Sequence, residues 1–282
     1  DNLFVVLAVV SVLIPLHEGS VIGGSFVLSA VLGIGFGVGA YRAGALDARG
    51  AVAGGLFAFW LLGLGGWDWA LPGFVFFVLS SLLSYQKASG AKKSKQDGRT
   101  LRQVLANGGV AWGLLVVSTF GAETSPLRPV CYAGFLGALA AAAADTWATE
   151  LGVRFSARPW SLRTGARVPA GQSGAVSLGG TVAAALGAGS VAAAATFASG
   201  IPGSADWGTM AAVIGAGLSG MVVDSLAGAF LQARYRDPTT DCWIENPLGQ
   251  EDRPVQGWKR IDNEVVNLLG TATGALAAVL FW

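Results

Sequence analysis

Long runs of hydrophobic residues, separated by short polar stretches, make up most of the 282-residue chain. The runs do not alternate apolar and polar residues as membrane-barrel strands do, so the pattern predicts helices and excludes a barrel. A helix needs about 20 apolar residues to cross a bilayer. On this basis we predict an all-α fold, a polytopic membrane helical bundle in a single integral membrane domain over residues 1–282. Its nine predicted spans are residues 3–16, 20–40, 51–66, 70–86, 103–120, 128–152, 174–199, 207–232 and 263–282.

The composition agrees with a protein that is embedded in lipid. Hydrophobic residues make up 53% of the chain, charged residues only 12%, and the mean hydropathy is +0.57. A soluble domain carries about 25% charged residues. The 42 glycines suit helices that approach each other closely, because lipid gives helices no hydrophobic drive to associate. The expected partner is therefore the lipid bilayer; a homodimer is compatible with the sequence, and a net charge of +1 gives no reason to expect nucleic acid.

The basic residues indicate the orientation in the membrane. If the amino terminus is cytoplasmic, 17 of the 18 lysines and arginines fall in cytoplasmic loops, and only Arg128 falls outside. Such an asymmetry is the positive-inside signal of membrane proteins. We therefore predict a cytoplasmic amino terminus and place any site built near these loops at the cytoplasmic face.

Acidic side chains within the predicted spans are the strongest chemical signal. A carboxylate in hydrocarbon costs at least about 2.5 kcal/mol, so it needs a polar partner, a metal or a substrate. Asp145 and Glu150 end the sixth span, and Asp224 lies in the eighth, and no lysine or arginine lies at the same depth within a span to pair with them. Carboxylate oxygens are typical ligands of Mg²⁺, which keeps further positions for phosphate and water. Asp145, Glu150 and Asp224 are the candidate metal ligands, with Thr149 one helical turn from Asp145.

A polar face opens the fifth span. Arg99, Gln103 and Asn107 are spaced four residues apart, so they lie on one side of a helix, and Arg102 adds a second arginine at its mouth. This face could guide a phosphate group into the bundle. The alternative is an arginine that reaches the interface and amides that bond a neighbouring helix.

Glycines and hydroxyl residues precede the seventh span. Backbone N–H groups in such a stretch can bind phosphate oxygens, and here the candidates are Arg167, Ser173, Gly174 and Ser177. Glycine-rich helix entrances are also common in membrane proteins, and the stretch has no Walker pattern. Asn263 and Asn267 lie on one face of the last span, where they could complete a metal or sugar site or bond another helix.

Five stretches carry a resemblance to a known family. In chain order they are GRTLRQVLANGG, ADTWATELG, PAGQSGAVSLGGT, GMVVDSLAGAFLQ and DNEVVNLLG, and together they span roughly residues 98–270. With them the chain resembles the phytyl-phosphate kinase family of integral membrane proteins, which includes transmembrane protein 19 relatives. More distantly it is similar to phytol kinase, dolichol kinase and CDP-diacylglycerol synthase. Thr149 stands where the family more often has serine, and Ala170 and Gln172 interrupt its usual Pro-Gly-Thr-Gly-Gly-like turn.

The resemblance implies an enzyme that transfers a phosphoryl group from CTP, with Mg²⁺, to an isoprenyl monophosphate. Phytyl phosphate would become phytyl diphosphate, in tocopherol or phylloquinone synthesis or in isoprenoid salvage. The implied membrane is a prokaryotic plasma or thylakoid membrane or a plastid membrane, with the site on the cytoplasmic or stromal face. The catalytic residues would be Asp145, Asp224, Arg99 and Asn107. Substrate and nucleotide would contact Arg102, Gln103, Thr149, Arg167, Ser173, Gly174, Ser177, Asn263 and Asn267.

Three other functions remain open at this point. A cytidylyltransferase would release pyrophosphate as the acceptor attacked the α-phosphate of CTP. An ion-coupled transporter would also use intramembrane carboxylates and broken helices, although its site would lie at the midplane rather than at the cytoplasmic helix ends. A purely structural protein would have no use for two unpaired aspartates.

Overall fold

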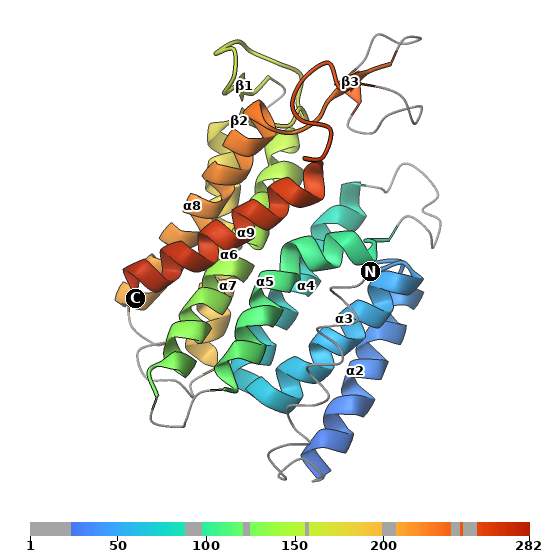
Figure 1. Cartoon of the computed structure of the whole chain (residues 1–282), viewed down its shortest axis with the longest axis vertical. Helices are drawn as coiled ribbons and strands as arrows, with labels where there is room; N and C mark the ends of the chain where they lie inside the picture. The colour runs from blue at the N-terminus through green and yellow to red at the C-terminus, as the bar shows by residue number, and fades with distance from the viewer. Residues whose placement is uncertain are drawn as a thin grey trace.

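The computed structural model describes residues 24–87, 98–120, 125–155, 158–198, 207–237, 243–244 and 253–282 (Figure 1). The described helices are α2 (Gly24–Arg42), α3 (Ala48–Trp60), the π-helical η1 (Leu61–Gly65), α4 (Trp67–Lys87), α5 (Leu101–Ser118), α6 (Leu127–Phe155), α7 (Leu178–Phe197), α8 (Trp207–Phe230) and α9 (Asn263–Phe281). Two short antiparallel hairpins pair β1 (Trp160–Ser161) with β2 (Ala175–Val176), and β3 (Tyr235–Arg236) with β4 (Trp243–Ile244).

The predicted helical membrane bundle is confirmed. Helices occupy eight of the nine predicted positions, and the span at 3–16 lies outside the described residues. Six helical segments are long and apolar enough to cross a membrane: 48–65, 67–84, 127–155, 178–197, 207–230 and 263–281. In α2 the apolar part is shorter, Phe26–Arg42, and α5 carries polar residues in its first two turns. The structure therefore does not establish nine crossings.

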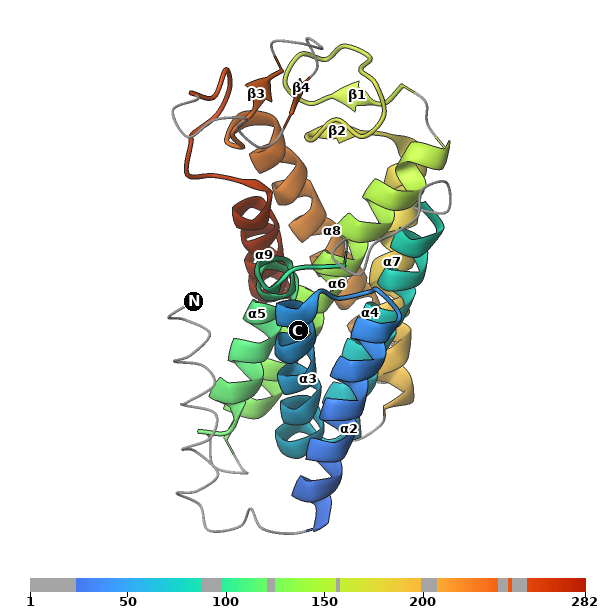
Figure 2. The ribbon, with the colours of Figure 1, turned by 90° about the vertical axis from the view of Figure 1, so that its right-hand side faces the viewer.

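Helix α6 lies inside the bundle, packed against α4, α5, α7, α8 and α9 (Figures 1 and 2). Every residue from 131 to 144 is buried, and most of them are alanine or glycine. A Cβ on Gly137 of α6 would lie 2.2 Å from the carbonyl oxygen of Gly274 on α9. A Cβ on Gly220 of α8 would lie 2.6 Å from the carbonyl oxygen of Gly270 on α9. These small residues let α6, α8 and α9 approach closely, which brings their polar positions together.

Helix α7 begins at Leu178, four residues after its predicted start at 174, so the predicted boundary was wrong. Gly174 has a left-handed backbone, φ +71°, and the next two residues form β2. Ser177 follows the strand and caps the helix, because its hydroxyl oxygen accepts the N–H of Gly180 at 3.0 Å. Residues 158–176 thus form a folded loop rather than the first turn of a span.

The short hairpins lie at one end of the bundle (Figure 2). At this end α6 and α8 finish, and α7 and α9 begin. Arg128, in the first turn of α6, is at the other end of that helix. The basic loops in the described chain therefore lie on one side of the bundle, as predicted. Which side of the membrane they face stays a prediction.

Candidate functional site

A polar cavity of about 390 Å³ opens between α4, α5, α6, α7, α8 and α9, beneath the loop that carries β1 and β2. It collects side chains from segments more than a hundred residues apart in sequence. Twelve of the fourteen predicted site residues line it: Arg99, Gln103, Asn107, Asp145, Thr149, Glu150, Ser173, Gly174, Ser177, Asp224, Asn263 and Asn267. The two that do not are Arg102 and Arg167.

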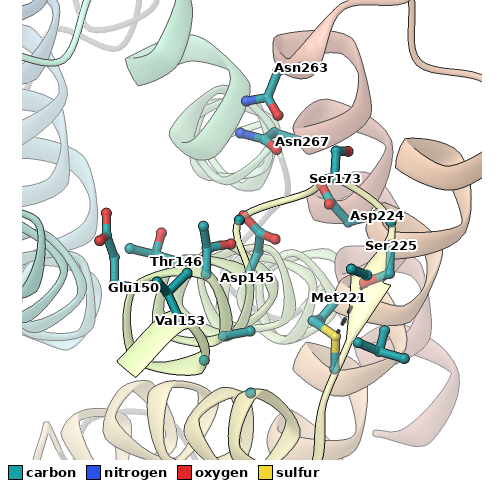
Figure 3. Close-up of a pocket in the computed structure, with 18 of the residues that line it drawn as sticks. Asp145, Thr146, Glu150, Val153, Ser173, Met221, Asp224, Ser225, Asn263 and Asn267 are labelled. Carbon is teal, nitrogen blue, oxygen red and sulfur yellow. Dashed lines mark hydrogen bonds between the residues drawn. The ribbon is translucent and has the colours of Figure 1, made fainter. Parts of the chain in front are cut away.

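Two aspartates face each other across this cavity (Figure 3). The carboxyl groups of Asp145 on α6 and Asp224 on α8 lie close enough to interact electrostatically. The side-chain amide of Asn267 on α9, oriented by its hydrogen-bond partners, donates to Asp224 Oδ2 at 3.0 Å. Gly270 makes this approach possible, because a Cβ there would lie 3.1 Å from the Cβ of Asp224. The predicted meeting of the two aspartates is therefore present in the fold.

Glu150 does not join the aspartate pair, so the predicted set of three carboxylate ligands is not formed. Five residues separate Glu150 from Asp145, which rotates its side chain by about 140° around the helix axis. Glu150 Oε1 instead accepts a hydrogen bond from Ser84 Oγ on α4 at 3.2 Å. Among the described residues, no group of three or more His, Cys, Asp or Glu side chains could hold a metal.

The aspartate pair still suits a hard divalent cation. Mg²⁺ in phosphate-handling sites is commonly bound by one or two carboxylates plus substrate phosphates and water, without a complete protein cage. Asp145 and Asp224 supply two carboxylates from two helices, and the amide of Asn263 adds a neutral oxygen on the same cavity wall. The donor chemistry of these residues therefore fits Mg²⁺ bound together with a phosphate ligand.

Arg99 enters the cavity from the segment before α5. Its backbone N–H donates to the carbonyl of Ala45 at 3.0 Å, and its own carbonyl accepts the N–H of Asp47 at 3.1 Å. Its guanidinium lies 3.5 Å from Ser84 Oγ, the hydroxyl that donates to Glu150. These contacts hold the arginine head inside the bundle, where it can meet an anionic ligand.

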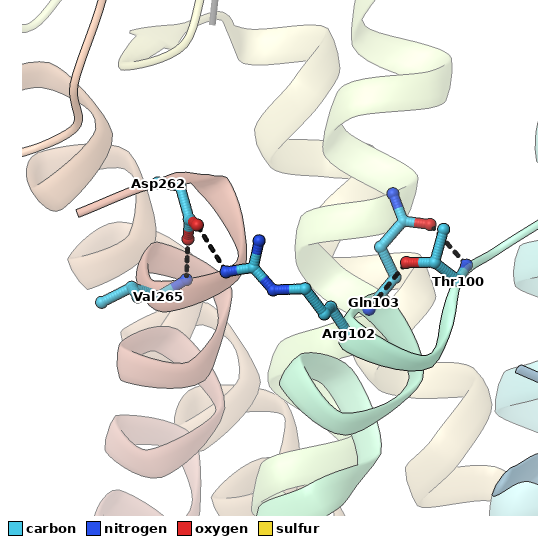
Figure 4. A network of polar contacts seen from close by, with 5 residues as sticks. All are labelled: Thr100, Arg102, Gln103, Asp262 and Val265. Atoms are coloured by element: carbon cyan, nitrogen blue, oxygen red, sulfur yellow. Dashed lines mark hydrogen bonds and ion pairs between the residues drawn. The ribbon is translucent and has the colours of Figure 1, made fainter. Parts of the chain in front are cut away.

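Gln103 has a structural role that the sequence prediction omitted. The capping box at the start of α5 uses both its backbone and its side chain (Figure 4). Its N–H donates to Thr100 Oγ1 at 3.4 Å, and its Oε1 accepts the N–H of Thr100 at 3.0 Å. The side chain still lines the cavity, but its carbonyl oxygen serves the helix end.

Arg102 points away from the cavity because it is about 100° around the helix from Gln103. It pairs with Asp262 Oδ2 at 2.6 Å, although 67% of the Arg102 side chain is exposed (Figure 4). Asp262 also caps α9 by accepting the N–H of Val265 at 3.0 Å. Burial raises the pKa of Asp262, but the hydrogen bonds from Val265 and Arg102 outweigh it and hold that pKa below its ordinary value. The pair joins the starts of α5 and α9.

Arg167 also lies outside the cavity. It stacks over the ring of Trp160, 4.2 Å from the ring centroid, and donates to the carbonyl of Arg158 at 2.6 Å. Both contacts are within the loop that carries β1 and β2, so in this arrangement Arg167 stabilises the loop.

Three helices begin at the cavity: α5, α7 and α9. Their caps are Thr100, Ser177 and Asp262, and each first turn presents backbone N–H groups with a partial positive charge. Helix starts of this kind attract phosphate oxygens. The cap residues are visible in the sequence, but their convergence depends on how the helices pack.

The end of α8 holds the loop at the cavity, which the sequence did not reveal. Ser173 Oγ donates to Gln232 Oε1 at 2.5 Å, and the guanidinium of buried Arg234 donates to the carbonyl of Ser173. A Cβ on Gly174 would lie 2.5 Å from the Cα of Ala229. The available signal was a glutamine and an arginine immediately after a membrane-length apolar run.

The fold and the cavity together define a polytopic integral membrane protein with a carboxylate pair and an arginine in one polar chamber. The profile of the family described as "Integral membrane protein DUF92" matches residues 31–275, and the chain belongs to this family. It is 27% identical over 242 residues to an uncharacterized membrane protein of Methanocaldococcus jannaschii, covering 84% of this chain and 86% of that one. It is 28% identical over 257 residues to Protein PGR of Arabidopsis thaliana, covering 81% and 86%. No solved structure matches the chain.

Proposed function

We propose that this protein transfers the γ-phosphoryl group of CTP to an isoprenyl monophosphate, with phytyl phosphate as the favoured acceptor. The observation that supports it best is the single cavity that contains Asp145, Asp224 and Arg99 together with three helix starts. Carboxylates for a metal and positive groups for phosphate are the components that phosphoryl transfer needs. The choice of CTP and of an isoprenyl acceptor rests on the family resemblance of the five motifs.

The proposed step balances without a catalytic histidine. An oxygen of the acceptor phosphate attacks the γ-phosphorus of CTP and forms a new P–O bond. The bond from that phosphorus to the β,γ-bridging oxygen breaks, and its electron pair leaves on CDP. A phosphate monoester is largely dianionic at neutral pH, since its second pKa is about 6, so no general base has to remove a proton.

The side chains divide into two groups around this step. Ser173 and Gly174, in the loop before β2, and Ser177, the cap of α7, are assigned to the triphosphate, which they would bind through backbone N–H groups and the Ser177 hydroxyl. Arg99 and Asn107 lie on the α5 side and are assigned to the acceptor phosphate. Asp145 and Asp224 would hold Mg²⁺, which supplies charge neutralisation for the transferring phosphoryl group when bound.

The orientation belongs to the same proposal. The basic loops would place the cavity at the cytoplasmic or stromal face, where nucleoside triphosphates are available.

The direct test combines purified protein, Mg²⁺, a panel of nucleoside triphosphates and several isoprenyl monophosphates, followed by mass analysis of the products. The expected result is isoprenyl diphosphate and CDP in equal amounts, with CTP as the best donor. Label in the γ-phosphate of CTP should enter the lipid.

Two other results would contradict this proposal and indicate a different function. Transfer of label from the α-phosphate with release of pyrophosphate would identify a cytidylyltransferase. Ion-coupled solute uptake into vesicles, without turnover of any triphosphate, would identify a transporter.

A further inference from the structure

A second cavity, of about 420 Å³, lies beside the polar one, between α2, α3, α4 and α5. Three polar residues line one side of it, and the rest of its lining is leucine, phenylalanine, tryptophan, alanine, valine and glycine. Along α4 its lining extends from Phe77 to Trp67, ten residues or about 15 Å at the rise of an α-helix. It is therefore a deep apolar chamber that can hold an extended hydrocarbon chain.

The two cavities share one wall. Arg99, Gln103 and Asn107 line both of them, and they are the three polar residues of the second. Near this wall Phe77 and Val104 pack against the cluster that contains Leu46, and Trp67, ten residues before Phe77, begins α4. A ligand with its anionic head at Arg99 would thus find the aspartate pair on one side and the apolar chamber on the other.

We propose that the apolar chamber binds the hydrocarbon chain of the acceptor, so that both cavities form one site for a single-chain lipid phosphate. This deepens the proposed function and takes from it the identity of the acceptor. It gives the hydrocarbon chain a defined chamber between α2, α3, α4 and α5.

The membrane gives the chamber a selective role. A chain that leaves the bilayer for the chamber exchanges one apolar environment for another, so burial adds little affinity. The shape and depth of the walls decide which chains fit, and a chain longer than the chamber must bend or remain partly in lipid.

The chamber also has exposed edges through which a chain can enter. Leu32 on α2 and Phe74 on α4 line it and are 40% and 54% exposed in the described structure. Between these helices the ring of Phe36 contacts Phe77 with centroids 4.8 Å apart, and Phe74 with centroids 6.5 Å apart. We assign this edge between α2 and α4 as the route by which the lipid chain passes from the bilayer.

Photo-crosslinking tests the site without requiring turnover. The probe is a phytyl monophosphate analogue with a diazirine at the end of its chain, bound to the full-length protein in detergent and in vesicles. We expect label on wall residues such as Leu61, Leu62 and Leu71, and competition by phytyl monophosphate but much less by phytol. Label confined to residues that face lipid, such as Val31 and Leu82, would overturn the assignment.

Filling the chamber gives a second test. Ala58→Phe on α3 should raise the Kd for phytyl monophosphate at least about tenfold and leave that for prenyl monophosphate within about twofold, because the added ring excludes only the chain. Val52→Phe is the matched control, since Val52 is on the same helix and 58% exposed. Ala70→Leu, at the deep end, is a milder variant in case Ala58→Phe fails to fold.

The two proposals fail differently. If the probe labels the chamber but no triphosphate reacts, the lipid site stands and the kinase function falls. If the kinase is active and both filled variants bind phytyl monophosphate like the wild type, the chamber assignment falls alone.

Discussion

Replacing Asp224 by asparagine removes one of the two carboxylates at the centre of the cavity while keeping the size of the side chain. Asp224 lies close to Asp145 and accepts a hydrogen bond from Asn267, so it lies where the metal and the transferring phosphoryl group are proposed to meet. The change halves the formal charge of the pair when both carboxylates are ionised. We expect turnover to fall at least about a hundredfold.

The magnitude follows from typical electrostatic contributions to catalysis. Loss of one preorganised group that stabilises transition-state charge costs about 2.7–4 kcal/mol, or about a hundredfold to a thousandfold in rate. The charge lost here belongs to a proposed metal ligand between membrane helices, so the effect should lie in this range. Asp145→Asn should cost a similar amount.

Stability distinguishes a catalytic role from a structural one. Two carboxylates that lie close together repel when both are charged, and asparagine removes that repulsion, so the Tm of Asp224→Asn without metal should equal or exceed that of the wild type. Mg²⁺ should raise the Tm of the wild type, because a ligand at a hundred times its Kd adds about 2.7 kcal/mol of stability. The variant should lose this response.

The assay measures turnover by diphosphate formation and the Tm in detergent with and without Mg²⁺. Asp262→Asn is the matched control, because it makes the same chemical change outside the cavity and asparagine is an equally good helix cap. Near-normal turnover in Asp224→Asn, or an unchanged Mg²⁺ response, would refute the paired-carboxylate site.

Three further predictions test other parts of the site. Arg99→Ala should raise the KM for the isoprenyl phosphate more than that for CTP, since Arg99 lies on the acceptor side; a selective rise for CTP would reverse the two pockets. Gly174→Ala should raise the KM for CTP and lower the Tm more than Gly165→Ala does. Both glycines have positive φ, but only at position 174 does a Cβ meet backbone, so equal effects would contradict the loop assignment. Arg102→Ala should cost at most about 1 kcal/mol of stability and leave turnover nearly unchanged, because the ion pair is largely exposed. Since the pKa of Asp262 is depressed, this small stabilisation should be present at neutral pH and disappear as an acid titration of the Tm passes below about pH 4.

The helices and the chemical types of the site residues could be predicted from the sequence. Apolar runs of membrane length correctly predicted helices at eight positions. The predicted start of α7 was wrong by four residues because of a local backbone feature, the left-handed Gly174. The four-residue spacing of Gln103 and Asn107 correctly put them on one face of α5, because a helix determines which side chains are neighbours along it. Arg99 reaches the same cavity from the segment before the helix, so its place on that helical face was predicted wrongly.

The packing of the helices against one another could not be predicted in this way. Asp145 and Asp224 are 79 residues apart, and they meet because glycines and alanines let α6, α8 and α9 pack closely. Glu150 was misassigned because the 140° turn from Asp145 leads to α4, a neighbour that periodicity does not identify. Arg102 and Arg99 are three residues apart, yet one pairs at the surface and the other lines both cavities. The apolar chamber could not be anticipated at all, because a cavity is the space that packed helices leave between them, and the periodicity of a single helix carries no information about it.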